Sequence, residues 1–157
     1  MSRKETKAIF PGSFDPFTVG HESIVLRGLS MFDKVVVAVG VNNEKHGYFA
    51  VDKRIMLIEK VFEGVENVEV ASYEGLTVDY ARQIGATHIL RGLRTSSDFE
   101  FERAIALTNK QISGIDTAFL LTAPEHMHVS SSVIRDIMRY GGDVSAFLPE
   151  RIRDLVK

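Results

Sequence analysis

Short apolar runs alternate with amphipathic segments from one end of the chain to the other. Five runs have the length of strands, and they cover 8–10, 35–41, 68–71, 88–90 and 117–121. Apolar residues recur at helical spacing over 24–32, 55–62, 101–112 and 133–138, and a last short helix is expected after Pro149. Because the strand-like runs are apolar on both faces, they favour a parallel sheet covered by helices on both sides. We therefore predict an α/β fold: a single domain over 1–157 with a Rossmann-like parallel sheet.

The composition fits one globular domain and removes several classes of function. The chain has 157 residues, of which 45% are hydrophobic and 25% charged, and its formal net charge is −2. This balance argues against a nucleic-acid-binding or membrane-binding surface but is compatible with a local basic pocket. There is no cysteine, so disulfides, thiolate nucleophiles and cysteine-ligated zinc are excluded. The polar segment 1–7 and the lack of a long apolar run predict a cytoplasmic protein.

In an open parallel sheet, ligands bind beyond the carboxyl ends of the strands, near the point where the strand order reverses. This rule directs attention to four loops, which we expect at 11–19, 42–50, 91–98 and 122–132. None of them contains G-x-G-x-x-G or G-x-x-x-x-G-K-[ST], so the sequence supports neither a binding site for a nicotinamide or flavin dinucleotide nor a P-loop.

The first loop reads PGSFDPFTVGH over 11–21 and runs directly into an amphipathic helix. Gly20 and His21 would lie in the first turn of that helix, where free N–H groups and the helix dipole favour a phosphate. The histidine would add one more donor at the same place. The alternative is a tight strand-to-helix turn that carries a surface histidine.

A second phosphate candidate is the segment VSSSVIR over 129–135. Consecutive serines that open a helix can simply cap it, which is the structural alternative. Three of them supply more donors than one cap uses, and Arg135 follows within one helical turn, so a triphosphate cradle is plausible. The preceding His126 and His128 have metal-ligand spacing, but without a third ligand we expect no metal there.

The third candidate is the pair Arg91 and Arg94, which flanks Gly92 and Leu93 at the end of a buried strand. Arginine suits bidentate contacts to phosphate, which indicates a phosphate clamp. The alternative is a pair of surface salt bridges with Asp98, Glu100 or Glu102. Lys45, in the loop after the second strand, carries no signal by itself.

Taken together and in order, these segments resemble the bacterial phosphopantetheine adenylyltransferase family, within the nucleotidylyltransferase superfamily. The resemblance spans essentially the whole chain. It rests on PGSFDPFTVGH, on N-x-x-K followed by Phe49 and Arg54, on RGLRTSSDFEFE, on SSS-x-x-R and on the terminal GDVSAFLPE. The T-x-G-H sequence, with Thr18 first, is the family's form of the superfamily's H-x-G-H signature.

The resemblance implies roles for residues of this chain. It makes His21, Lys45 and Arg94 catalytic, and it places Ser13, Lys45, Thr77 and Arg91 against phosphopantetheine. The ATP-binding residues that it implies are Ser13, Phe14, His21, Gly92, Leu93, Arg94, Glu102, His126, Met127, His128, Val129, Ser130, Ser131 and Ser132. Small departures from the family pattern occur at Asn43, Gly47, Thr77 and Phe101, and all of them lie outside the signature.

The implied reaction transfers AMP from ATP to 4′-phosphopantetheine and gives dephospho-coenzyme A and pyrophosphate. The resemblance also implies Mg²⁺ bound mainly through the ATP phosphates, a homohexamer, and coenzyme A as a feedback ligand. Two other functions stay open. One is a related nucleotidylyltransferase that acts on nicotinate mononucleotide or glycerol phosphate, and the other is a non-catalytic nucleotide-binding regulatory domain.

Overall fold

The computed structural model describes residues 2–156 and contains a five-stranded parallel sheet. The strands are β1 (Lys7–Gly12), β2 (Lys34–Gly40), β3 (Val68–Tyr73), β4 (His88–Leu93) and β5 (Asp116–Leu121). Their order in the sheet is β3-β2-β1-β4-β5. Strands β2 and β3 are added on one side of β1, and β4 and β5 are then added on its other side. The strand order therefore reverses between β1 and β4. This is the position where open α/β sheets bind ligands.

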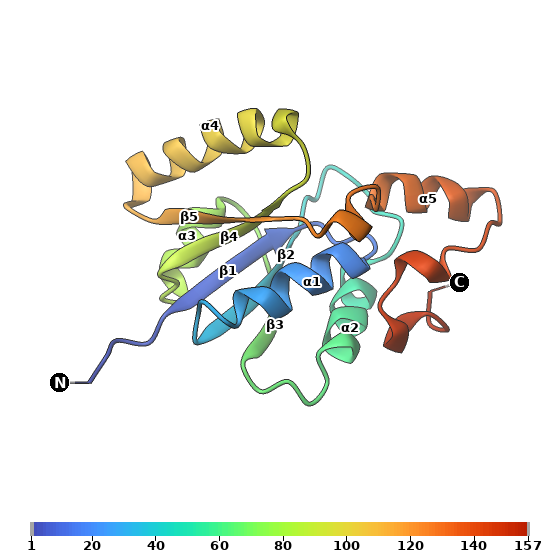
Figure 1. The fold of residues 1–157 in the computed structure, drawn as a ribbon, viewed down its shortest axis with the longest axis horizontal. Coiled ribbons are helices and arrows are strands. Elements are labelled where there is room, and N and C mark those ends of the chain that lie inside the picture. The colour runs from blue at the N-terminus through green and yellow to red at the C-terminus, as the bar shows by residue number, and fades with distance from the viewer. Residues whose placement is uncertain (1, 157) are drawn as a thin grey trace.

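Helices connect the strands and cover both faces of the sheet. They are α1 (Val19–Gly28), α2 (Val51–Val61), α3 (Thr77–Gln83), α4 (Ser96–Ser113) and α5 (Ser131–Arg139). Figure 1 shows α4 lying along β5, on the far side of the sheet from α1. Short 3₁₀ turns follow at Pro124–His126, Ser145–Phe147 and Glu150–Ile152.

Alternate residues of the strands feed two separate cores, as the period of a strand requires. Ala8 and Phe10 join the larger core, which contains the apolar sides of α1, α2 and α5. Ile9 points to the opposite face and packs in a smaller core with Val78 and Ala81 of α3. The two-sided apolar runs of the sequence are thus explained by a sheet that is buried on both faces.

The predicted fold class is confirmed, and all five predicted strands are present. The strand β4 extends to Leu93, so Arg91 and Gly92 lie in the strand rather than in the predicted loop. The apolar pattern did not predict α3, because this helix has only seven residues and its apolar face is short. The expected short helix after Pro149 is present as a 3₁₀ helix, Glu150–Ile152, and Ile152 and Val156 are buried.

The helix over the predicted stripe 101–112 is also present, but its apolar side does not enter the core. No residue of α4 is buried, and Phe101 and Leu107 are more than 60% exposed. On β5, at the edge of the same sheet, Leu121 is 72% exposed. Within residues 2–156, no helix is long and apolar enough to span a membrane.

Candidate active site

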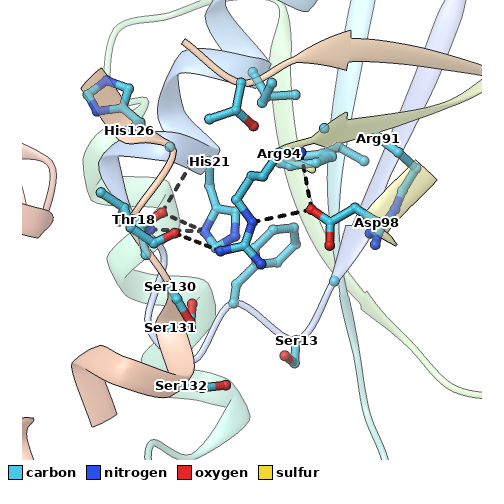
Figure 2. Close-up of a pocket in the computed structure, with 18 of the residues that line it drawn as sticks. Ser13, Thr18, His21, Arg91, Arg94, Asp98, His126, Ser130, Ser131 and Ser132 are labelled. Atoms are coloured by element: carbon cyan, nitrogen blue, oxygen red, sulfur yellow. Dashed lines mark hydrogen bonds and ion pairs between the residues drawn. The ribbon is translucent and has the colours of Figure 1, made fainter. Parts of the chain in front are cut away.

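A cavity of about 360 Å³ opens at the reversal point, beyond the carboxyl ends of β1 and β4. Figure 2 shows its labelled side chains, with Ser130, Ser131 and Ser132 on one side and Ser13 across from them. The walls come from three segments, 10–24, 91–102 and 122–135, which are distant in the sequence but which parallel topology brings to one edge of the sheet. The lining residues are Phe10–Phe14, Thr18, Gly20, His21, Ile24, Arg91, Gly92, Arg94, Asp98, Glu102, Thr122, His126, Val129–Ser132 and Arg135.

His21 is fixed in this cavity by the N-terminus of its own helix. Thr18 is the N-cap of α1, and its hydroxyl accepts a hydrogen bond from the backbone N–H of His21 at 3.3 Å. In return, the backbone N–H of Thr18 donates to Nδ1 of His21 at 3.0 Å. This reciprocal pair is a capping box with histidine in the place of the usual glutamate. Because Nδ1 accepts that hydrogen bond, the proton of the neutral ring resides on Nε2.

Three phenylalanine rings surround the imidazole. The ring centroids of Phe14 and Phe17 lie 5.0 and 5.3 Å from that of His21, and that of Phe10 lies at 6.2 Å. Burial, and after it the positive charges of Arg91 and Arg94, lower the pKa of His21 from 6.5 to about 3. His21 is therefore a neutral hydrogen-bond donor at physiological pH.

The backbone of the first loop bends sharply so that the Phe14 ring can take this position. Phe14 has a φ of 50°, in the left-handed region that residues with a side chain seldom adopt. The absence of a side chain at Gly12 makes room for the ring, since an ideal Cβ there would lie 2.9 Å from Cζ of Phe14. Strain of this kind is typical of functional sites.

The N-terminus of α5 forms the opposite wall, and its three serines make different contacts. Ser130 is the N-cap, and its hydroxyl accepts a hydrogen bond from the backbone N–H of Val133 at 3.5 Å. Ser131 donates to the carbonyl of Pro16 at 2.9 Å, and Ser132 accepts from Nη2 of Arg135 at 3.2 Å. The structure thus confirms that one of the serines caps the helix, which was the structural alternative to a phosphate cradle. It also places all three serines at the cavity, where the helix dipole favours an anion.

Arg91 and Glu102 form a closely bonded pair on the wall between this cavity and a neighbouring one. Nη2 of Arg91 lies 2.6 Å from Oε1 of Glu102, and Nε contacts both carboxylate oxygens at 3.2 Å. Nη1 donates to the carbonyl of Pro11 at 2.6 Å. Two N–H groups of the guanidinium, one on each Nη, are left for a ligand, because the fork has five in all. Arg91 is thus oriented and partly neutralised.

Arg94 is held more loosely. Its Nη1 donates to the carbonyl of Val129 at 3.1 Å, and its Nε lies 3.5 Å from Oδ2 of Asp98 (Figure 2). The salt-bridge alternative for Arg91 and Arg94 is therefore present in the structure, but both side chains also line the cavity. Together with Arg135, they place three guanidinium groups on one cavity of a chain whose net charge is −2.

Most of the predicted site residues come together here, and a few do not. Ser13, Phe14, His21, Gly92, Arg94, Glu102, His126, Val129 and the three serines all line the cavity. Leu93, Met127 and His128 do not. The side chain of Leu93 is buried, and His128 lies edge-on to the ring of Phe147. Lys45 is exposed in its loop and lines neither cavity.

A second cavity of about 180 Å³ adjoins the first and shares Pro11, Gly12, Arg91 and Glu102 with it. Thr77, predicted to contact phosphopantetheine, lines this second cavity, and its hydroxyl lies 2.8 Å from that of Tyr73. The other lining residues are Ile89, Ile105, Ala106, Asn109 and Thr117. The Thr117 hydroxyl is buried and has no hydrogen-bond partner in the structure.

The sequence reasoning missed several residues of this second cavity, although a signal for them exists. Glu102, Ile105, Ala106 and Asn109 are spaced at i, i+3, i+4 and i+7, which places them on one face of α4. Only Glu102 was a predicted site residue. Asp15 and Arg54 belong to segments that carry the resemblance but were given no role in the site, because a buried charge cannot be told from a surface charge in a sequence.

No group of three or more His, Asp or Glu side chains that could hold a metal ion occurs among residues 2–156. The two carboxylates in the first cavity, Asp98 and Glu102, are each already paired with an arginine. The His126–His128 spacing does not lead to a ligand cluster in the described part of the chain.

The comparison with known proteins first defines a class. A family model described as cytidylyltransferase-like matches residues 9–137. Among solved structures, a bifunctional NMN adenylyltransferase/ADP ribose pyrophosphatase from Francisella tularensis superposes with a TM-score of 0.70 at 15% identity. The superposition covers 92% of this chain and 45% of that one. At this identity the likeness concerns the fold alone.

Closer relatives then narrow the class. A phosphopantetheine adenylyltransferase from Flavobacterium psychrophilum is 51% identical over 94% of this chain and 97% of its own. One from Limosilactobacillus reuteri is 44% identical over 96% of this chain and 87% of its own. The chain belongs to the phosphopantetheine adenylyltransferase family, within the cytidylyltransferase-like proteins.

Proposed function

We infer that this chain transfers the adenylyl group of ATP to 4′-phosphopantetheine, forming dephospho-coenzyme A and pyrophosphate. The observation that carries this inference is the first cavity. It combines three guanidinium groups, a neutral histidine donor and the N-termini of two helices at the reversal point of the sheet. Such a cavity suits two phosphate-bearing substrates, and close relatives are named for this reaction.

The chemistry needs no general base, because the nucleophile is a phosphate oxygen that is already ionised at neutral pH. The difficulty is to bring two polyanions together and to stabilise the charge that develops at the α-phosphate. Positioning and preorganised electrostatics therefore supply the rate. His21, with its proton on Nε2, would donate to the α-phosphate, while Arg94 and the N-terminus of α5 would hold the remaining phosphates.

Magnesium fits this site as an ion held by the nucleotide. Since Asp98 and Glu102 are paired with arginines, this cavity offers no carboxylate cage, and phosphate oxygens and water would be the main ligands. When bound, the ion would neutralise charge on the triphosphate. Removal of Mg²⁺ with a chelator should abolish turnover and leave the fold unchanged, as followed by circular dichroism.

The second cavity supports the placement of phosphopantetheine. Its apolar surface from Ile89, Ile105 and Ala106 suits the alkyl portions of a pantetheine chain, and the side chains of Thr77, Asn109 and Thr117 supply polar partners for its amides. Arg91 stands between the two cavities, where the phosphate of this substrate would meet the α-phosphate of ATP. Coenzyme A and dephospho-coenzyme A contain the same chain and would occupy the same two cavities.

Exposed apolar side chains on α4 and β5 support the further proposal that the protein assembles, as a homohexamer. Phe101, Leu107 and Leu121 are apolar and each more than 60% exposed, and contact with other copies of the chain would bury them. Sedimentation equilibrium should give a mass near six times 17.5 kDa. A monomer at micromolar concentration would refute the assembly.

The experiment that tests the function is a single incubation with ATP, Mg²⁺ and 4′-phosphopantetheine, followed by mass spectrometry for dephospho-coenzyme A. Parallel reactions contain nicotinate mononucleotide with ATP, or glycerol phosphate with CTP. We expect product in the first reaction only. Product in a parallel reaction and none in the first would assign the chain to a different acceptor. A nucleotide that binds without any product would favour the regulatory-domain alternative.

A further inference from the structure

Two buried and oppositely charged side chains contact the wall of the first cavity. Asp15 directly follows Phe14, which lines the cavity, and Arg54 donates to the carbonyl of Ser13, which also lines it. Asp15 and Arg54 are 5% and 7% exposed, and neither lines the cavity itself. Buried charges are costly unless hydrogen bonds compensate them, so their contacts indicate what they are for.

Asp15 holds the segment that follows Lys45. Its Oδ2 accepts a hydrogen bond from the backbone N–H of Tyr48 at 2.7 Å, and its Oδ1 accepts one from the N–H of Phe49 at 2.9 Å. The first loop thus extends a carboxylate across to the second loop, 33 and 34 residues further along the chain.

Arg54 joins the same two loops through their carbonyl groups. Its Nε donates to the carbonyl of Phe49 at 3.0 Å, and its Nη1 donates to the carbonyl of Ser13 at 2.9 Å. The planar fork of a guanidinium reaches both acceptors at once. Gly47 packs between the two charges, since an ideal Cβ on it would lie 2.8 Å from Oδ2 of Asp15 and 3.0 Å from Nη2 of Arg54.

Lys45 lies between two fixed points of the second loop. On its N-terminal side, Asn42 closes a turn in which its carbonyl accepts from the N–H of Lys45 at 3.1 Å and its side chain accepts from the N–H of Glu44 at 3.0 Å. On its C-terminal side, the contacts of Asp15 and Arg54 begin at Tyr48. Between these points the loop is exposed.

We propose that Arg54, together with Asp15, is a positioning residue that fixes the Lys45 loop to the Ser13 loop, so that one acceptor phosphate is held from both loops. This inference rests on the proposed function for the identity of the acceptor. Arg54 itself touches neither substrate, because it lines neither cavity. It acts through the distance between Ser13 and Lys45, and its loss would affect the phosphopantetheine side rather than the ATP side.

The test compares wild type with Arg54→Met, Arg54→Lys, Lys45→Ala and the double variant Lys45→Ala/Arg54→Met. Lys60→Met is the matched control, because Lys60 is a cation on the same helix whose partner is the surface residue Glu63. Three quantities are measured: KM for 4′-phosphopantetheine, Kd for ATP by calorimetry, and hydrogen exchange of the Tyr48 and Phe49 amides. The third does not depend on activity, so it tests the loop contacts even if the proposed function fails.

We expect Arg54→Met to raise KM for phosphopantetheine about tenfold, as for the loss of one charge-assisted hydrogen bond. Kd for ATP should change less than about twofold, and exchange at Tyr48 and Phe49 should accelerate. Arg54→Lys, which keeps the buried charge but not the fork, should give a smaller increase in KM and keeps the test available if Arg54→Met does not fold. The double variant should be no worse than Lys45→Ala alone, because Arg54 acts through the Lys45 loop.

Two results would overturn the proposal. One is a double variant in which the two increases in KM multiply, which would mean that Arg54 acts independently of Lys45. The other is an Arg54 variant, Lys or Met, that weakens ATP binding as much as it raises KM, which would indicate general damage to the fold. Lys60→Met should match wild type in all three measurements.

Discussion

The imidazole of His21 turns back onto the N-cap of its own helix, so that Nδ1 accepts the backbone N–H of Thr18 at 3.0 Å. The local helix start therefore decides the tautomer of a residue that faces the cavity. The Thr18 hydroxyl also lies 3.2 Å from Nδ1, so both the backbone and the side chain of Thr18 contact the imidazole. The surrounding phenylalanine rings then keep the imidazole neutral.

The first prediction concerns the protonation of His21. Because its pKa in the folded protein is about 3, its ring protons should not titrate in NMR spectra between pH 8 and pH 5. In the unfolded chain the pKa returns to about 6.5. Below that pH the unfolded state therefore binds a proton that the folded state does not, and the free energy of unfolding falls as the pH drops toward 3. A His21 midpoint near 6.5 in the folded protein would contradict the assigned environment.

The second prediction concerns the role of His21 in turnover. His21→Ala should lower kcat by ~10²–10³, as for the loss of one preorganised donor, while Kd for ATP changes little. His21→Gln is the matched comparison, since its side-chain amide places an N–H donor near the position of Nε2. It should retain more turnover than His21→Ala in steady-state assays. Near-normal kcat in His21→Ala would refute the role.

The third prediction concerns the contribution of the Thr18 hydroxyl, as the N-cap of α1, to the stability of the fold. Thr18→Val removes the hydroxyl that caps α1 and should lower the free energy of unfolding by about 1 kcal/mol in a urea titration. Thr18→Ser keeps the hydroxyl and should be close to wild type. Equal stability of the valine and serine variants would show that the cap contributes nothing.

The fourth prediction concerns the Arg91–Glu102 pair, in which the Glu102 side chain is only 12% exposed. Arg91→Met should cost about 2 kcal/mol of unfolding free energy, because it leaves a largely buried carboxylate without its partner. Glu102→Gln in the same protein should recover part of this loss, so the two changes would be non-additive. Arg91→Met, Glu102→Gln alone and the double variant should all use phosphopantetheine poorly. Strict additivity in urea unfolding, or unchanged kinetics in Arg91→Met, would contradict the role of the pair.

Strong local patterns made the sheet predictable. The run 35–41 is apolar at nearly every position because β2 is buried on both faces, and it forms the strand Lys34–Gly40. The first turn of α1 was also predictable, since Gly20 and His21 lie in it. By contrast, α3 has only two buried residues, Val78 and Ala81, and its apolar signal is too short to stand out.

The candidate site, like the fold, was predictable from the sequence only in part. Motifs identified the residues of the first cavity because Ser13, His21 and Arg94 belong to segments of unusual composition. The bonding of Arg91 to Glu102 was only one of several alternatives, since a sequence gives no distance between β4 and α4. The apolar stripe of α4 was also ambiguous: Phe101 has the spacing of a core residue yet is 69% exposed. Which face of a helix meets the sheet depends on tertiary packing, and periodicity alone does not specify it.

The most direct test of the central claim follows the phosphorus atoms of ATP. The protein is incubated with Mg²⁺, 4′-phosphopantetheine and ATP that carries a radioactive label at either the α- or the γ-phosphate. If the cavity catalyses adenylyl transfer, the α label appears in dephospho-coenzyme A and the γ label appears only in pyrophosphate. Transfer of the γ label to the acceptor, or an acceptor that gains no label from either nucleotide, would contradict it.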